Sequence, residues 1–174
     1  MTEKQSRRAS LPAGVERNAL STLVATWFHV GLIRPAPGTW GSMAAVPIGL
    51  VLALVGGTYL VLAGAVLVFV AGLWASHRMI GGMTDETESD DQPSIVVDEV
   101  AGQLLALTTA GVSPFLFVLG FAFFRLFDII KPWPIGWIDR RIPGAWGVML
   151  DDVLAGLFAA IAVWIVAFLI QNYV

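Results

Sequence analysis

The sequence predicts an all-α membrane protein: a polytopic helical bundle with four to five transmembrane or re-entrant helices and a short N-terminal interfacial helix. Of its 174 residues, 57% are hydrophobic and only 13% are charged, whereas soluble domains carry about 25% charged residues. The apolar residues form long blocks without charge, and about 20 such residues cross a bilayer as a helix. The chain has no cysteine, which excludes disulfides, thiolate metal sites and cysteine nucleophiles.

The N-terminal segment 1–18 is polar and predicts a cytoplasmic tail, because it carries basic residues and no apolar run. The apolar stretch 19–33 is too short to span a membrane and leads directly into Arg34-Pro35. It therefore predicts an interfacial helix rather than a cleaved signal peptide. We expect the remainder, 19–174, to form one membrane-embedded domain.

Two charge-free blocks predict three of the spanning helices. From 35 to 77 there is no Asp, Glu, Lys or Arg, and Gly56-Gly57 interrupts this block near its middle. It predicts two helices, near 42–55 and 58–76, joined by a tight turn. The block 153–174 predicts the last helix. An acidic run follows the first block and predicts a solvated loop; its first members are Asp85, Glu86 and Glu88.

A third block, 100–124, decides the topology. A single crossing would place the charges that precede it and those that follow it on opposite sides of the membrane. A turn at 111–114 would instead give two helices, 95–110 and 115–130, whose polar ends return to one face. We favour this hairpin because it places all ten Lys and Arg on one side, as the positive-inside rule prefers. Each arm would reach only about 24 Å, which is marginal for a full span.

Five carboxylates lie against apolar segments, where burying a charge is costly unless the group is functional or paired. An all-oxygen set of this kind suits Mg²⁺ together with a phosphate. Two structural alternatives stay open. Arg125, Asp128 and Lys131 are spaced by three and would form an ion-pair ladder on one helix face, and Asp151-Asp152 would favour a helix N-terminus. The five residues are Asp98, Glu99, Asp128, Asp151 and Asp152.

Candidate phosphate ligands accompany these carboxylates. The segment 37–42 reads PGTWGS, and its hydroxyls and free N–H groups at a helix entry would receive an anion. The alternative is that Thr39 or Ser42 only caps the helix. Four cationic side chains are candidates to hold phosphate oxygens. They are Arg125, Lys131, Arg140 and Arg141.

Four ordered motifs make the chain resemble the phosphatidylglycerophosphatase A family of bacterial membrane enzymes, over about 23–159. The motifs are PGTWGS at 37–42, DQPSIVVDE at 91–99, FRLFDIIKPWPI at 124–135 and GVMLDDVLAG at 147–156. The chain departs from the family pattern at 27–31, where only Gly31 of a glycine-rich stretch remains, and at Gly144-Ala145, where the family has paired glycines. We expect His29 to serve local packing and His77 to be interfacial.

The resemblance implies Mg²⁺-dependent dephosphorylation of phosphatidylglycerophosphate to phosphatidylglycerol at the cytoplasmic face of the bacterial inner membrane. The expected partners are this substrate and membrane lipid, with no nucleic acid, and the oligomeric state stays open. Direct attack by water and an aspartyl-phosphate intermediate both remain possible mechanisms, and phosphatidate is an alternative substrate. The implied roles are catalysis by Asp98, Glu99, Asp128 and Asp152, metal binding by these four and Asp151, and phosphate binding by Thr39, Ser42, Arg125, Lys131 and Arg140.

A different class of function competes with the enzyme. An ion transporter or a structural subunit of a membrane assembly would use the same carboxylates as a cation site. A transport path, however, distributes polar groups through the depth of the bilayer, whereas here the middle parts of the predicted helices are apolar.

Overall fold

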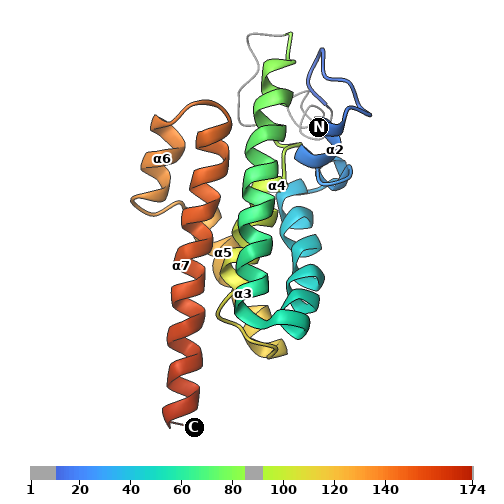
Figure 1. Cartoon of the computed structure of the whole chain (residues 1–174). Helices are drawn as coiled ribbons and strands as arrows, with labels where there is room; N and C mark the ends of the chain where they lie inside the picture. The colour runs from blue at the N-terminus through green and yellow to red at the C-terminus, as the bar shows by residue number, and fades with distance from the viewer. Residues whose placement is uncertain (1–10, 85–91, 174) are drawn as a thin grey trace.

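The described residues, 11–84 and 92–173, form a helical bundle without strands in a computed structural model (Figure 1). This confirms the all-α class. The long helices lie side by side, and the short helices gather at the end of the bundle that also holds the first described residues. The helices are α2 (Leu20–Ala25), the 3₁₀ helix η2 (Val30–Leu32), α3 (Pro37–Gly81), α4 (Val97–Leu107), α5 (Pro114–Ile130), α6 (Ile135–Arg141) and α7 (Gly144–Tyr173).

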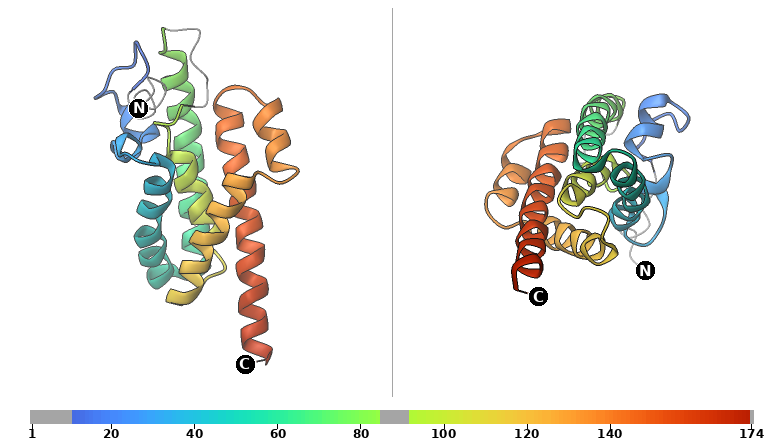
Figure 2. Two further views of the ribbon diagram at one scale, coloured as in Figure 1. Left: turned by 180° about the vertical axis from the view of Figure 1, so that it is seen from behind. Right: turned by 60° about the horizontal axis from the view of Figure 1, so that its bottom comes forward.

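Helix α3 consists of two antiparallel arms that meet at Gly57. Gly57 has φ 62° and ψ −158°, a conformation that glycine adopts readily because it has no Cβ. The arms return alongside each other (Figures 1 and 2), and Leu52 on the first arm packs against Gly64 on the second. The predicted helix pair is confirmed, although the first arm begins at Pro37 and already contains the PGTWGS segment.

Helices α4 and α5 form the predicted hairpin. Gly111 lies in the turn with φ 58°, and α5 starts with Pro114 after an N-cap residue, Ser113, whose hydroxyl accepts from the Leu116 N–H at 3.5 Å. With 11 residues, α4 is only about 16 Å long, too short to cross a bilayer alone. The hairpin returns the polar start of α4 and the polar end of α5 to the same end of the molecule.

Helix α7 begins earlier than the sequence predicted. It starts at Gly144, about two turns before Asp151, so the alternative in which Asp151-Asp152 occupy a helix N-terminus is wrong. Helices α3 and α7 are both long and apolar enough to cross a membrane. Both aspartates are buried although α7 is otherwise apolar, which points to a role beyond capping.

The interfacial segment is not one helix. Helix α2 covers only Leu20–Ala25, and η2 follows after Trp27, Phe28 and His29, all of which have positive φ. Three consecutive left-handed residues cannot continue a right-handed helix. His29 packs locally, with its Nε2 atom 3.1 Å from the carbonyl oxygen of Arg17. The acidic run of Asp85, Glu86 and Glu88 lies outside the described residues, as does 1–10.

Helix α4 occupies the middle of the bundle and packs against α3, α5 and α7 (Figure 2). Two glycines allow a close approach to α7. A Cβ atom at Gly156 would overlap the carbonyl oxygen of Gly102, and one at Gly102 would lie 2.5 Å from the carbonyl oxygen of Asp152. The two helix backbones are therefore nearly in contact at the level of Asp152.

Candidate active site

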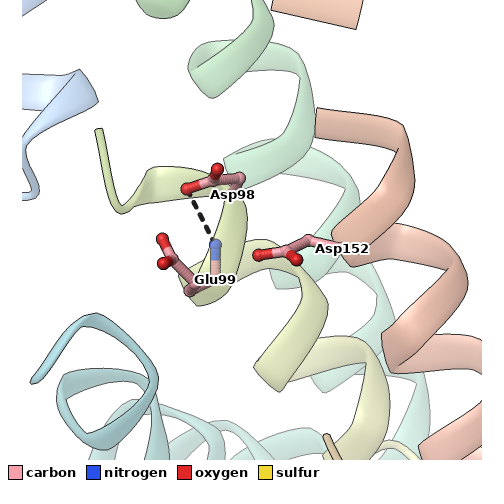
Figure 3. Close-up of side chains that lie close together, drawn as sticks. All are labelled: Asp98, Glu99 and Asp152. Atoms are coloured by element: carbon pink, nitrogen blue, oxygen red, sulfur yellow. Dashed lines mark hydrogen bonds between the residues drawn. The ribbon is translucent and has the colours of Figure 1, made fainter. Parts of the chain in front are cut away.

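Three carboxylates from α4 and α7 meet at the polar end of the bundle. Asp98 and Glu99 lie in the first turn of α4, and Asp152 faces them from α7 (Figure 3). Their oxygen atoms approach within 4.8 Å of one another. We call Asp98, Glu99 and Asp152 the carboxylate cluster. Since Gly102 is one turn after Asp98 and Gly156 one turn after Asp152, the glycine contact brings these carboxylates together.

The cluster is held in place by local hydrogen bonds and by burial. The Glu99 backbone N–H donates to Asp98 Oδ1 at 3.0 Å (Figure 3). Asp98 and Asp152 are only 7% and 4% exposed. Glu99 Oε2 is buried without a hydrogen-bond partner among the described residues. A buried carboxylate oxygen of this kind requires a cation or a donor, so the cluster fits a metal ion with oxygen ligands.

The start of α3 packs directly against the cluster. A Cβ atom at Gly38 would overlap Glu99 Oε1 and would lie 3.4 Å from Arg125 Nη1. Glycine is therefore required at this position of the PGTWGS motif by the close approach of the Glu99 carboxylate. The N-cap of α3 is Ala36 and makes no side-chain hydrogen bond, so the alternative in which Thr39 or Ser42 caps the helix is wrong.

Arg125 links α5 to the start of α3. Its Nη1 atom forms an ion pair with Asp128 Oδ2 at 2.7 Å and donates to Ser42 Oγ at 3.3 Å. Ser42 Oγ in turn donates to the Gly38 carbonyl oxygen at 2.9 Å. Arg125 Nε is buried and has no partner among the described residues. Arg125 is thus fixed beside the cluster with donor capacity left for an anion.

Lys131 does not complete the ladder predicted along α5. The helix ends at Ile130, and Lys131 follows in a left-handed conformation with φ 46°. Its ammonium group instead pairs with Asp139 of α6 and with Asp151 of α7, the latter at 2.6 Å. Burial lowers the pKa of Lys131, but the hydrogen bonds and charges of Asp139 and Asp151 outweigh burial and hold the pKa above its ordinary value. Lys131 is therefore a charged residue at neutral pH.

Sequence reasoning did not predict Asp139 or its helix. Helix α6 has only seven residues, which are too few to show a clear hydrophobic period. In the same segment, the sequence predicted a role only for Arg140 and Arg141, as phosphate ligands. Local signals that could have indicated this helix are the spacing of Ile135 and Ile138 and the basic Arg140-Arg141 in its last turn.

A cavity of about 1120 Å³ joins these groups. Four predicted phosphate ligands do not line it. Ser42 contacts Arg125 instead, and Thr39 is half-buried on α3. Arg140 and Arg141 are exposed, and the Arg140 guanidinium lies near Gly136. The charged lining residues are Arg34, Asp98, Glu99, Arg125, Asp128, Lys131, Asp139, Asp151 and Asp152.

The five predicted metal ligands therefore line one cavity but differ in their contacts. Asp98, Glu99 and Asp152 form the cluster, whereas Asp128 is paired with Arg125 and Asp151 with Lys131. Asp128 still lies close enough for its charge to act on Asp152. A carboxylate cluster flanked by an arginine and a lysine can hold a metal ion next to a phosphate.

A helical bundle with long apolar helices and a cavity of carboxylates and cations at its polar end is typical of a membrane enzyme that acts on a charged group. The family model for phosphatidylglycerophosphatase A matches residues 23–167, and the chain belongs to this family. It is accordingly an enzyme, a phosphoric monoester hydrolase of the phosphatidylglycerophosphatase type.

Curated relatives agree with this family over most of their length. The chain is 37% identical to phosphatidylglycerophosphatase A of Haemophilus influenzae over 147 residues, which cover 84% of this chain and 88% of the relative. It is 34% identical to phosphatidylglycerophosphatase A of Escherichia coli, over 79% of this chain and 78% of the relative. It is also 34% identical to a putative phosphatidylinositol-3-phosphatase of Bacteroides thetaiotaomicron, over 84% and 96%. No solved structure is significantly similar to the chain.

Proposed function

We propose that this enzyme removes the terminal phosphate of phosphatidylglycerophosphate in a Mg²⁺-dependent reaction at the cytoplasmic face of the bacterial inner membrane. The family supports the substrate. The carboxylate cluster carries the proposal for the metal, because three carboxylates lie within 4.8 Å of one another and one buried oxygen lacks a partner. A ligand set made only of oxygen atoms suits Mg²⁺ better than it suits softer metals, which favour nitrogen or sulfur ligands.

Each side chain then has a role that follows from its contacts. Asp98, Glu99 and Asp152 hold the ion, which when bound supplies neutralising charge and a water of lowered pKa. Arg125 binds phosphoryl oxygens through the N–H groups that do not contact Asp128 or Ser42. Lys131, paired with Asp151, adds a second positive charge to the cavity lining. Positioned cations stabilise the charge on the phosphoryl oxygens during transfer.

Two mechanisms are compatible with these roles. In the first, water attacks phosphorus, the bond to the glycerol oxygen breaks, and the leaving alkoxide takes a proton. In the second, an aspartate carboxylate attacks phosphorus while the bond to the glycerol oxygen breaks and the leaving alkoxide takes a proton; water then hydrolyses the acyl phosphate to aspartate and inorganic phosphate. An acid quench during a single turnover of substrate labelled with ³²P in the monoester separates them, because only the second mechanism leaves the label covalently bound to an aspartate. Absence of protein-bound label at times when product has formed would reject the aspartyl-phosphate intermediate.

The first experiment is phosphate release by the purified protein in detergent. We expect hydrolysis of phosphatidylglycerophosphate with Mg²⁺, loss of activity with a chelator, and recovery when Mg²⁺ is restored. Asp98→Asn and Asp152→Asn should lower kcat by about 100-fold or more, as removal of metal or transition-state contacts commonly does. Glu16→Gln, which changes an exposed carboxylate outside the cavity, is the matched control.

Full turnover by folded Asp98→Asn and Asp152→Asn proteins at saturating Mg²⁺ would disprove the metal assignment. The headgroup is tested with phosphatidate and with phosphatidylinositol 3-phosphate, which the name of the Bacteroides relative makes a specific second candidate. Faster turnover of either lipid than of phosphatidylglycerophosphate would overturn the proposed substrate.

We also propose a topology in which the arms of α3 and helix α7 cross the membrane while α4 and α5 form a re-entrant hairpin. The lengths support it: the first arm of α3 and α5 are about 30 Å and 26 Å long, but α4 is only about 16 Å. The described lysines and arginines gather at the polar end, which the positive-inside rule assigns to the cytoplasm.

A further inference from the structure

One wall of the cavity, formed by the segment 34–38, has no role in the reaction proposed above. The carboxylates that line the cavity and Arg125 come from α4, α5, α6 and α7, and Lys131 follows the end of α5, but the segment 34–38 also lines the cavity. This segment connects η2 to α3 and lies on the other side of the bundle from α6 (Figures 1 and 2). The cavity thus extends from the cluster toward a wall that carries its own cation, Arg34.

The backbone that presents Arg34 is held in one conformation. Pro35 and Pro37 restrict φ, and Ala36 lies between them in the left-handed region with φ 56°. The indole N–H of Trp40 donates to the Pro35 carbonyl oxygen at 3.0 Å. Four residues after Arg34, Gly38 touches the Glu99 carboxylate, so Arg34 belongs to a wall whose inner end reaches the cluster. Arg34 itself is exposed and contributes to the lining of the cavity.

The substrate class places a second anion next to the reacting one. Phosphatidylglycerophosphate carries a phosphomonoester and, across one glycerol, a phosphodiester that stays negatively charged throughout the reaction. Arg125 and Lys131 lie with the carboxylates on the side where the monoester reacts. An arginine suits a phosphodiester because its guanidinium donates two parallel hydrogen bonds to phosphate oxygens.

We propose that Arg34 binds the phosphodiester of the substrate and thereby selects lipids that carry a diester beside the phosphate to be removed. This inference rests on the proposed function, since it presumes turnover of phosphatidylglycerophosphate. It assigns Arg34 to ground-state binding and specificity, whereas Arg125 and Lys131 act on the monoester.

The test compares wild type with Arg34→Gln and Arg34→Lys in mixed micelles. We expect Arg34→Gln to raise KM for phosphatidylglycerophosphate about tenfold, the loss of one charge-assisted interaction, with kcat within about twofold. The inhibition constant of phosphatidylglycerol, which keeps the diester but lacks the monoester, should rise by a similar factor. The inhibition constant of inorganic phosphate, a probe of the monoester site, should stay unchanged. Arg34→Lys should be intermediate.

Arg78→Gln is the matched control, because Arg78 is an exposed arginine at the polar end that does not line the cavity; it should leave all three constants unchanged. Equal losses for Arg78→Gln would mean that surface charge alone attracts the anionic lipid, and the inference would fail. It would also fail if the constants for phosphatidylglycerol and inorganic phosphate rose together, or if neither changed. These outcomes differ from failure of the proposed function, in which wild type would not hydrolyse phosphatidylglycerophosphate.

Discussion

Lys131 lies between carboxylates from two different helices. These two ion pairs, and not the spacing of Lys131 from Asp128 along the sequence, hold its ammonium group at the cavity. Asp139 on α6 and Asp151 on α7 both pair with its ammonium group. The side chain of Asp151 is 8% exposed and that of Asp139 is 31% exposed. The pair with Asp151 is thus the more shielded from solvent, and the pair with Asp139 is the more exposed.

Replacing Asp139 should therefore weaken phosphate binding without stopping the reaction. A partly exposed ion pair contributes up to about 1 kcal/mol, so we expect Asp139→Asn to raise KM and the inhibition constant of inorganic phosphate about three- to fivefold, with kcat nearly unchanged. Asp139→Glu, which keeps the charge, should restore most of the affinity. Wild-type constants in Asp139→Asn would show that Asp151 alone positions Lys131.

At the scale of elements, the contact between α4 and α7 decides whether the cluster exists. Gly102 leaves room for the α7 backbone and for the ring of Phe124. A Cβ atom at position 102 would lie 2.6 Å from the nearest atom of that ring. Gly156 lies against the backbone of Gly102. Backbone atoms cannot move aside as a flexible side chain can, so a larger residue here must separate the helices that carry Asp98 and Asp152.

We expect Gly156→Ala to lower the free energy of unfolding by about 1 to 3 kcal/mol, the usual cost of overpacking, and to raise the Mg²⁺ concentration needed for half-maximal activity. Thermal unfolding in detergent and a Mg²⁺ titration measure the two effects. Gly81→Ala is the control: it is also a helical glycine, but nothing lies within 4 Å of its Cβ position. Equal behaviour of the two variants would contradict the role assigned to the α4–α7 contact.

For the whole molecule, the hairpin turns of α3 and of α4–α5 lie together at one end (Figure 1). The residues that line the cavity come from the start of α3, the start of α4, the end of α5 and the N-terminal part of α7, toward the other end. Polar groups are concentrated around the cavity, while the opposite end exposes apolar side chains such as Val55 and Tyr59. This separation matches an enzyme that works on lipid headgroups at one membrane face. Within the described residues, the stretches 35–77, 100–124 and 153–173 carry no charged side chain that could line an ion path through the bilayer.

The topology can be measured with single cysteines, because the chain has none of its own. Tyr59→Cys lies at the turn of α3, where the side chain is 85% exposed, and Arg141→Cys ends α6. We expect a membrane-impermeant maleimide to label Tyr59→Cys in intact spheroplasts and Arg141→Cys only after lysis. The unmodified chain gives the background. Labelling of Arg141→Cys in intact cells would reverse the proposed orientation.

The sequence by itself determined the helical class, the helix pair around Gly57, the hairpin around Gly111 and the residues of the four motifs. Charge-free blocks and glycine turns are local signals, and apolar length relates directly to the membrane thickness. The same local signals missed α6, because a seven-residue helix has too little periodicity, and merged α2 and η2, because composition does not reveal the left-handed residues between them.

Only the tertiary structure decided which charges act together. Five carboxylates looked equivalent in the sequence, but the glycine contact between α4 and α7 selects Asp98, Glu99 and Asp152 for the cluster. Asp128 keeps the pair with Arg125 that the spacing along α5 offered, whereas the end of α5 before Lys131 allows Lys131 to pair with Asp151 of α7. Side-chain electrostatics depend on distances across helices that are far apart in the chain, and sequence spacing fixes such distances only within one helix.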